Sequence, residues 1–235
     1  MPTELSALHT GIDHRLTLNV SELFFSLQGE STYAGLPCVF IRLEGCNLRC
    51  RYCDARYTYE EAGSKQSLSE IFAFTERYPG AIVEITGGEP LLQENLIPLL
   101  QGLVDTGRTV LLETNGSLDL SMIPDRVIII MDVKCPGSGM DKKNCLANIA
   151  ILKTYDEIKF VLCNRADYDW AVSCLRHHSL IDPATGQMTR RVLFSSVMGE
   201  LAPADLAAWI LHDRLPVRLQ LQLHKILWPG NERGA

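Results

Sequence analysis

Residues 37 to 61 read PCVFIRLEGCNLRCRYCDARYTYEE, an apolar run that leads directly into three closely spaced cysteines. The run 37–43 has the length and the Val and Ile content of a buried β-strand. Cys46, Cys50 and Cys53 follow it in the spacing C-x3-C-x2-C. Sites in parallel α/β proteins are built where the strands end, so this stretch carries both a fold signal and a site signal.

The same kind of apolar run recurs along the chain, and segments of helical period lie between most of these runs. The further predicted strands are 81–86, 109–114, 126–133, 157–162, 190–197 and 217–223, and the predicted helices are 67–78, 94–107, 166–178 and 202–213. Ser67 and Glu70 form a capping box, and Gly107 provides a left-handed C-cap. The alternation predicts a mainly parallel sheet, because parallel strands need crossover connections.

One connection interrupts this alternation. The link 114–126 is too short for a full crossover helix, so we expect a curved, partial barrel in the α/β class. Length predicts a single domain over residues 1–235, with a short N-terminal extension of about 1–15 and an irregular C-terminal tail of about 229–235. Residues 177–191 are predicted to form an exposed connection.

Composition and charge limit which binding partners and which cellular compartment we expect for this protein. The chain is 46% hydrophobic and 21% charged with a formal net charge of −6, and it has no basic stripe for a phosphate backbone, so no nucleic-acid partner is expected. The N-terminus lacks a signal-peptide pattern, and no segment approaches the roughly 20 apolar residues of a membrane span. We therefore expect a cytoplasmic protein without membrane contact, in which clustered cysteines are metal-binding or catalytic.

The three clustered cysteines allow three interpretations. Their spacing fits one face of a helix, although the intervening residues are polar and Gly45 starts a helix poorly. A zinc site would need a fourth ligand, for which Asp54 or the distant Cys38 is available. An iron–sulfur cluster with three thiolate ligands would leave one iron open for a small molecule. The other cysteines are predicted to be small buried hydrophobes: Cys38, Cys135, Cys145, Cys163 and Cys174.

Two motifs carry a resemblance that favours the third interpretation. The segment CNLRCRYC (46–53) resembles the signature of the radical S-adenosylmethionine (SAM) superfamily, and TGGEP (86–90) resembles its methionine-binding segment. The resemblance implies a partial, modified (β/α)6 barrel of the radical SAM type. It also implies a 4Fe-4S cluster on Cys46, Cys50 and Cys53 that cleaves S-adenosyl-L-methionine to methionine and a deoxyadenosyl radical.

Longer segments resemble one family within that superfamily, 7-carboxy-7-deazaguanine synthase. They are FFSLQGESTYAGLPCVFIRLEGCN, ITGGEPLLQ, MDVKCPGSG and LQLHK, and they span most of residues 20 to 228. The resemblance implies a carbon–nitrogen lyase that contracts 6-carboxy-5,6,7,8-tetrahydropterin to 7-carboxy-7-deazaguanine with loss of ammonia, on the route to queuosine and related deazapurines. It also implies a homodimer served by a flavodoxin-type electron donor.

The resemblance assigns roles to individual positions. The implied SAM-binding residues are Gly87, Gly88, Glu89, Asn115, Asp132, Val133 and Lys134; the implied substrate-binding residues are Leu27, Gln28, Gly29, Arg42, Thr86 and His224. Glu89 offers a carboxylate to an ammonium group, and Arg42 is a bidentate fork suited to the substrate carboxylate. The alternative for Arg42 is a surface ion pair with Glu44, and for His224 a strand-end histidine satisfied by solvent.

Two positions depart from the family pattern. The family's Cys-Asp-Thr places a magnesium-ligating hydroxyl two residues after the last cysteine, whereas this chain has Cys53, Asp54 and Ala55. Mg²⁺ then either binds through Asp54, water and substrate oxygens or is dispensable. The chain also continues for ten residues beyond Lys225. Two other functions stay open: an activase that installs a glycyl radical on a protein, and a non-catalytic zinc-binding module.

Overall fold

Strand β2 (Pro37–Leu43), the apolar run before the cysteines, lies inside a nine-stranded sheet with the order β3-β1-β2-β4-β5-β6-β7-β8-β9. The computed structural model describes residues 12–231 and 233–234. The other strands are β1 (Thr17–Leu27), β3 (Ser64–Ser67), β4 (Ile82–Gly87), β5 (Val110–Thr114), β6 (Ile128–Lys134), β7 (Glu157–Leu162), β8 (Arg191–Ser196) and β9 (Arg218–Gln220). From β2 to β9 all neighbours are parallel, as the alternation predicts.

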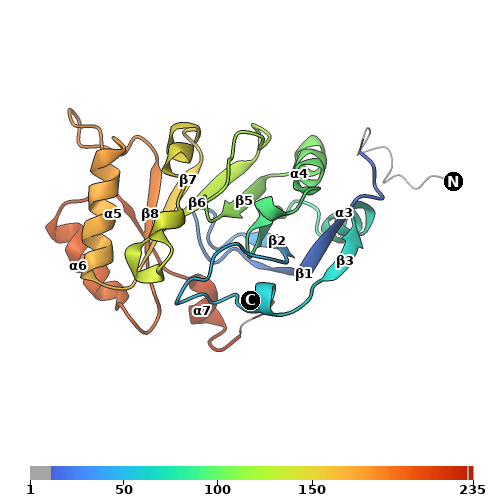
Figure 1. The fold of residues 1–235 in the computed structure, drawn as a ribbon, viewed down its shortest axis with the longest axis horizontal. Helices are drawn as coiled ribbons and strands as arrows, with labels where there is room; N and C mark the ends of the chain where they lie inside the picture. The colour runs from blue at the N-terminus through green and yellow to red at the C-terminus, as the bar shows by residue number, and fades with distance from the viewer. Residues whose placement is uncertain (1–11, 232, 235) are drawn as a thin grey trace.

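Helices flank this sheet. They are α2 (Tyr57–Glu60), α3 (Leu68–Glu76), α4 (Leu96–Asp105), α5 (Arg165–His177), α6 (Pro203–His212) and α7 (Leu223–Leu227), with short 3-10 helices η1 (Pro90–Leu92), η2 (Pro136–Ser138), η3 (Asp141–Lys143) and η4 (Leu146–Ala150). The predicted capping box of Ser67 and Glu70 starts α3. Figure 1 shows α3 and α4 near one end of an open, curved sheet and α5 and α6 near the other, which is a partial barrel.

The connection from β5 to β6 contains no helix, as its length predicts, although the two strands are parallel neighbours. The link 177–191 forms a turn closed by a bridge between Ile181 and Met188. The sequence prediction misses β1 and β3, which pair antiparallel at one edge of the sheet. Strand β1 mixes buried and half-buried positions without strict alternation, so its periodicity gives a weak strand signal.

The predicted strand 217–223 is partly wrong. Its alternating pattern favours a strand, but only Arg218–Gln220 pair with β8 at the sheet edge. The chain then turns, and Leu223–Leu227 form helix α7. This local change matters because α7 carries His224 and Lys225 back beside the cysteine loop (Figure 1).

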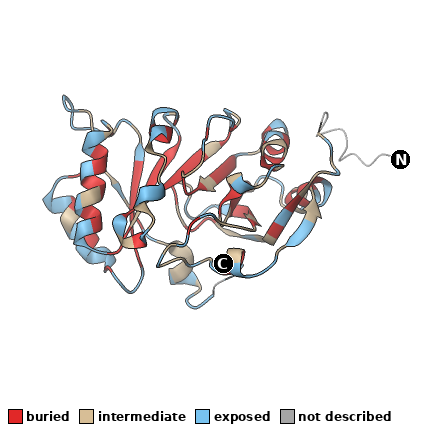
Figure 2. Cartoon of the chain, viewed as in Figure 1, coloured by how far each residue is buried: buried red, intermediate tan, exposed pale blue. Residues whose placement is uncertain are grey.

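The core lies where the apolar strands meet the inner faces of the helices, which Figure 2 shows as buried strands and half-buried helices. Cys38, Cys135, Cys163 and Cys174 are buried, as predicted, and Cys145 is partly buried. Among residues 12–231 and 233–234, none of the helices combines the length and the apolar character that a membrane crossing requires.

Candidate active site

The cysteine loop leaves β2 through Gly45, whose φ of +91° is a left-handed conformation that glycine adopts without strain. No helix forms over residues 46–53, so the helix-face interpretation of the three cysteines is wrong. Arg51 fastens the loop: its backbone N donates to the Ser138 carbonyl at 3.0 Å and its guanidinium pairs with Glu200 at 2.6 Å.

The three thiols are partly buried, and this burial raises the pKa of Cys50 and of Cys53 above that of a free thiol. A zinc ion would draw its ligands together around one point. Within the part of the chain that the structure describes, no three His, Cys, Asp or Glu side chains converge in that way. The thiolates of an iron–sulfur cubane bind different irons, so an open loop of three thiols fits three corners of such a cluster.

Neither of the two residues that the sequence offers as a fourth zinc ligand is available to the three cysteines. Cys38 is fully buried near the start of β2, whereas Cys46 follows the end of that strand. Asp54 pairs with Lys225 at 2.7 Å. The arrangement therefore favours the cluster over a zinc site.

The Gly-Gly turn after β4 packs directly on the cysteine loop. A Cβ added to Gly88 would lie 2.0 Å from the Gly45 carbonyl oxygen and 2.8 Å from Cys46 Cβ. The Glu89 backbone N donates to the same Gly45 carbonyl at 2.7 Å, and Gly88 N donates to Leu43 O at 3.2 Å. Only glycine at position 88 allows this approach, so the two motifs of the sequence form one structural unit.

Glu89 has a structural role that the sequence does not reveal. Its carboxylate is fully buried and accepts hydrogen bonds from Thr114 Oγ1 at 2.8 Å, Asn115 N at 2.7 Å and Leu91 N at 3.1 Å. Burial raises its pKa, against the effect of these hydrogen bonds. Instead of an open carboxylate for an ammonium group, the structure presents a carboxylate that joins the Gly-Gly turn to the end of β5.

The hydrogen bond from its backbone N to the Glu89 carboxylate positions Asn115. Its Nδ2 donates to Asn47 Oδ1 at 3.0 Å and lies 4.0 Å from Cys46 Sγ. The predicted SAM residue therefore does lie against the cysteine loop. The side chain of Val133, by contrast, is buried in the core, so only its backbone is available to a ligand.

A buried lysine organises the interior of the barrel. Lys159, on β7, pairs with Glu30 at 2.9 Å, with Asp132 at 3.4 Å, and with Glu113. Burial alone would lower the pKa of Lys159, but the three carboxylates outweigh burial and raise it, so the ammonium stays charged. Asp132 also pairs with Lys134 at 3.0 Å, which places two predicted SAM residues at the rim of this network.

The predicted substrate residues gather on the same interior. Thr86 Oγ1 donates to Glu113 at 3.1 Å, and Gln28 Nε2 donates to the buried Glu84. Burial, together with the nearby Glu113, raises the pKa of Glu84 well above its usual value, which favours the protonated carboxyl.

Arg42 pairs with a different carboxylate from the one that the sequence suggests. Its Nε donates to Glu22 Oε1 at 2.9 Å, and its side chain is 18% exposed, so the proposed surface pair with Glu44 is not formed. Tyr57 OH donates to the same oxygen of Glu22 at 2.6 Å. Glu22 thus fixes Arg42 through one edge of the guanidinium.

Helix α7 completes the site from the C-terminal side. His224 packs on Gly29, where an added Cβ would lie 2.4 Å from His224 Nδ1, so His224 is not a solvent-satisfied strand-end histidine. Burial lowers its pKa, which favours the neutral imidazole. Lys225 reaches both Asp54 and Gln222 at 2.7 Å. Lys225 and Arg42 lower the pKa of Asp54 to about 2, although the Asp54 side chain is more than half exposed.

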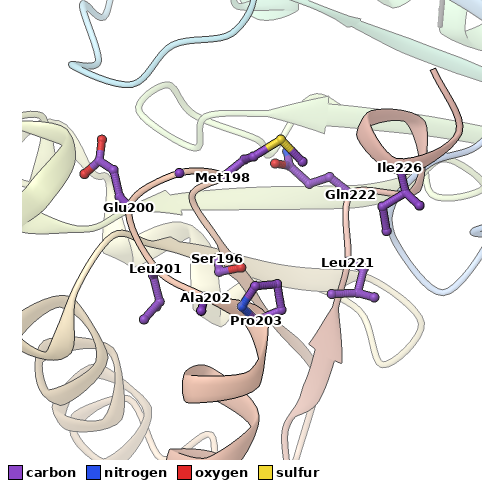
Figure 3. A pocket seen from close by; sticks show the side chains of 10 residues that line it. Ser196, Met198, Glu200, Leu201, Ala202, Pro203, Leu221, Gln222 and Ile226 are labelled. Carbon is purple, nitrogen blue, oxygen red and sulfur yellow. The ribbon is translucent and has the colours of Figure 1, made fainter. Parts of the chain in front are cut away.

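A cavity of about 310 Å³ opens beside this helix (Figure 3). It lies between the loop that carries Met198 and Glu200 and the segment that carries Leu221 and Gln222. Gln222 lines the cavity and also donates to Glu30 Oε1 at 2.9 Å. The cavity therefore borders the charged interior network and is not centred on it.

Sequence reasoning misses several residues of the site, namely Glu22, Glu30, Tyr57, Glu84, Lys159, Gln222 and Lys225. Two of them carry a readable signal. Glu84 and Lys159 are charges inside otherwise apolar strands, and a buried charge in such a run indicates a specific partner. The others lie in segments whose positions depend on the tertiary fold.

Comparison with known proteins agrees with this fold. The sequence pattern of the Radical SAM superfamily matches residues 40–137. The crystal structure of QueE from Escherichia coli covers 95% of this chain and 100% of its own, with a TM-score of 0.73 and 23% identity. Streptococcus suis SuiB bound to the precursor peptide SuiA covers 77% of this chain and 47% of its own, with a TM-score of 0.55 and 12% identity. Fold and cysteine site together define a radical SAM protein.

Full-length relatives narrow this class further. A 7-carboxy-7-deazaguanine synthase of Koribacter versatilis (strain Ellin345) is 44% identical over 227 residues, which covers 93% of this chain and 100% of the relative. One of Chlorobaculum tepidum is 44% identical over 221 residues, covering 93% and 97%. The chain belongs to the 7-carboxy-7-deazaguanine synthase family.

Proposed function

We propose that this protein converts 6-carboxy-5,6,7,8-tetrahydropterin to 7-carboxy-7-deazaguanine with loss of ammonia, as a radical SAM lyase in the biosynthesis of queuosine precursors. The observation that carries the proposal is that the residues predicted to bind a carboxylated pterin converge beside the cysteine loop. Arg42 on β2 and Thr86 on β4 are partners in the parallel pairing, and His224 on α7 lies close enough to Asp54, next to Cys53, to be affected by its charge.

Cys46, Cys50 and Cys53 would hold a 4Fe-4S cluster, and the open iron would bind SAM. When bound, the cluster and SAM supply the organic radical that starts the reaction. Gly87 and Gly88 let the backbone approach the methionine end of SAM closely. Asn115, Asp132, the Val133 backbone and Lys134 are proposed to contact SAM at the ends of β5 and β6.

The protein's own groups would bind and orient the pterin. Arg42, held through Nε by Glu22, can direct its other two nitrogens at a carboxylate. Leu27 and Gly29 offer backbone groups to the ring, and Gln28 and the Glu84 carboxyl add polar side chains beside them. A bicyclic ring rich in NH and C=O groups matches such a wall of paired polar side chains.

The partners and compartment are proposed on the same basis. We infer a cytoplasmic homodimer that receives electrons from a flavodoxin-type protein. The dimer and the electron donor are expectations from the family, and an anaerobic size-exclusion measurement would test the dimer.

Anaerobic reconstitution tests the proposed function directly. The protein should take up iron and sulfide, become brown and, with a reductant, SAM and the carboxylated tetrahydropterin, form 7-carboxy-7-deazaguanine and ammonia. A triple Cys46→Ala, Cys50→Ala, Cys53→Ala variant should form neither the chromophore nor the product. If the reconstituted wild type has an intact cluster but forms no product, the substrate assignment is wrong; if it holds zinc and stays colourless, the zinc-binding module is correct.

A further inference from the structure

Lys225 pairs with Asp54, the residue directly before Ala55, where the family pattern has a magnesium-ligating threonine. Its Nζ lies 2.7 Å from Asp54 Oδ2 and donates to Gln222 Oε1 at 2.7 Å. Gln222 in turn donates to Glu30, which pairs with the buried Lys159. The ammonium group is therefore held in one position by a chain of contacts that ends in the core of the barrel.

The residues at this place do not fit Mg²⁺. The ion requires a near-octahedral set of oxygens at about 2.1 Å. Ala55 offers a methyl group instead of a hydroxyl, and an ammonium already pairs with one oxygen of Asp54. In the described part of the chain, no third carboxylate, histidine or cysteine joins Asp54 in a metal-binding group.

The charges around the site call for a second cation. Asp54 lies under the influence of Lys225, Arg42 and Lys159, and Arg42 under that of Glu22, Asp54 and Glu113. Arg42 and Lys159 are already paired with carboxylates of the protein, so a substrate carboxylate beside Arg42 would be stabilised by a further positive charge. The described contacts of Lys225 use two of its three donor hydrogens, which leaves one for a ligand.

We propose that Lys225 supplies the second cation for the substrate carboxylate, so that substrate binding by this protein does not require Mg²⁺. This inference rests on the proposed function. Arg42, on β2, binds the carboxylate through two guanidinium nitrogens, and Lys225, on α7, binds it as a point charge. Asp54 and Gln222 position the ammonium, and they are positioning residues, not ligands of a metal.

Binding measurements on the reconstituted protein test the proposal. We measure the Kd of the carboxylated tetrahydropterin, and of tetrahydropterin without the carboxylate, with EDTA and with excess Mg²⁺. The Kd of the carboxylated compound should be the same in both buffers. Lys225→Met should weaken its binding by about tenfold or more, because a charge-assisted hydrogen bond is lost, and should leave binding of the uncarboxylated compound unchanged.

Matched variants separate this effect from loss of structure. Lys65→Met removes an exposed lysine on β3 and should bind like the wild type. Lys225→Arg should retain most of the affinity. Iron content and thermal midpoint report whether each variant folds. If Lys225→Met does not fold, the Kd values of Lys225→Arg and of the wild type with and without Mg²⁺ still test whether substrate binding depends on Lys225 or on Mg²⁺.

The possible outcomes are distinct. Tighter wild-type binding or turnover only with Mg²⁺, or equal binding by Lys225→Met, would overturn the role of Lys225 and leave the proposed function intact. If neither pterin binds and no product forms in either buffer, the proposed function itself fails.

Discussion

Glu84 on β4 and Lys159 on β7 are buried ionisable side chains, although each stands in a mostly apolar strand. The environment of Lys159 favours its charged form, whereas the environment of Glu84 favours its uncharged form. Lys159 is surrounded by carboxylates and stays charged, whereas burial and Glu113 raise the pKa of Glu84. At the residue scale, the site therefore combines a charged lysine with a carboxyl whose protonated form is favoured.

The raised pKa of Glu84 predicts a pH dependence of stability. The folded state binds more protons at Glu84 than the unfolded state, so this group lowers the free energy of unfolding as pH rises above the unfolded pKa of about 4.3. Glu84→Gln removes the titration and keeps an acceptor for Gln28. Its thermal midpoint should therefore rise relative to the wild type as pH increases, while exposed Glu94→Gln shows no such trend. A constant difference at all pH values would contradict this.

Arg42 makes a second residue-scale prediction. Arg42→Lys keeps the charge but loses the fork, so KM for the carboxylated pterin should rise by about tenfold with little change in stability. Steady-state assays of this variant and of exposed Arg77→Lys as a control give the comparison. An unchanged KM in Arg42→Lys would show that Arg42 does not bind the carboxylate.

The cysteine loop and the Gly-Gly turn form one unit at the element scale. Gly88→Ala brings a methyl group against the Gly45 carbonyl and Cys46, so the cysteine loop must move. Iron uptake during anaerobic reconstitution, followed by metal analysis and the visible spectrum, should fall strongly. Gly80→Ala is the control, because its φ of +83° makes alanine strained but its surroundings are open. Equal iron uptake by both variants would show that the contact does not matter.

At the scale of the whole molecule, the C-terminal residues return to the first strand. Gly234 N donates to Glu22 Oε2 at 3.2 Å, and Arg233 pairs with Glu61 and stacks over Tyr57. Glu22 therefore joins the tail to Arg42. Residues that the sequence leaves in an irregular tail thus lie beside the predicted carboxylate site.

This arrangement predicts two different responses to mutation. Arg233→Ala should leave the denaturant midpoint unchanged, because an exposed ion pair contributes little. Glu22→Gln should lower the free energy of unfolding by about 1 to 3 kcal/mol, because Arg42 loses its buried counter-charge. Urea denaturation of both variants measures this. Equal destabilisation by both changes would mean that the tail, and not Glu22, fixes this edge of the barrel.

The sequence by itself determined the parallel sheet and the cysteine loop at the end of β2, because apolar period and short-range spacing are local properties. It also placed the helices that begin with Ser67 and end before Gly107. Only the tertiary structure decided that α7 turns back to put Lys225 beside Asp54, and that Glu22 and not Glu44 holds Arg42. These pairs join segments far apart in the chain. A charged side chain is costly to bury without a partner, and the partners meet only when the whole barrel has folded.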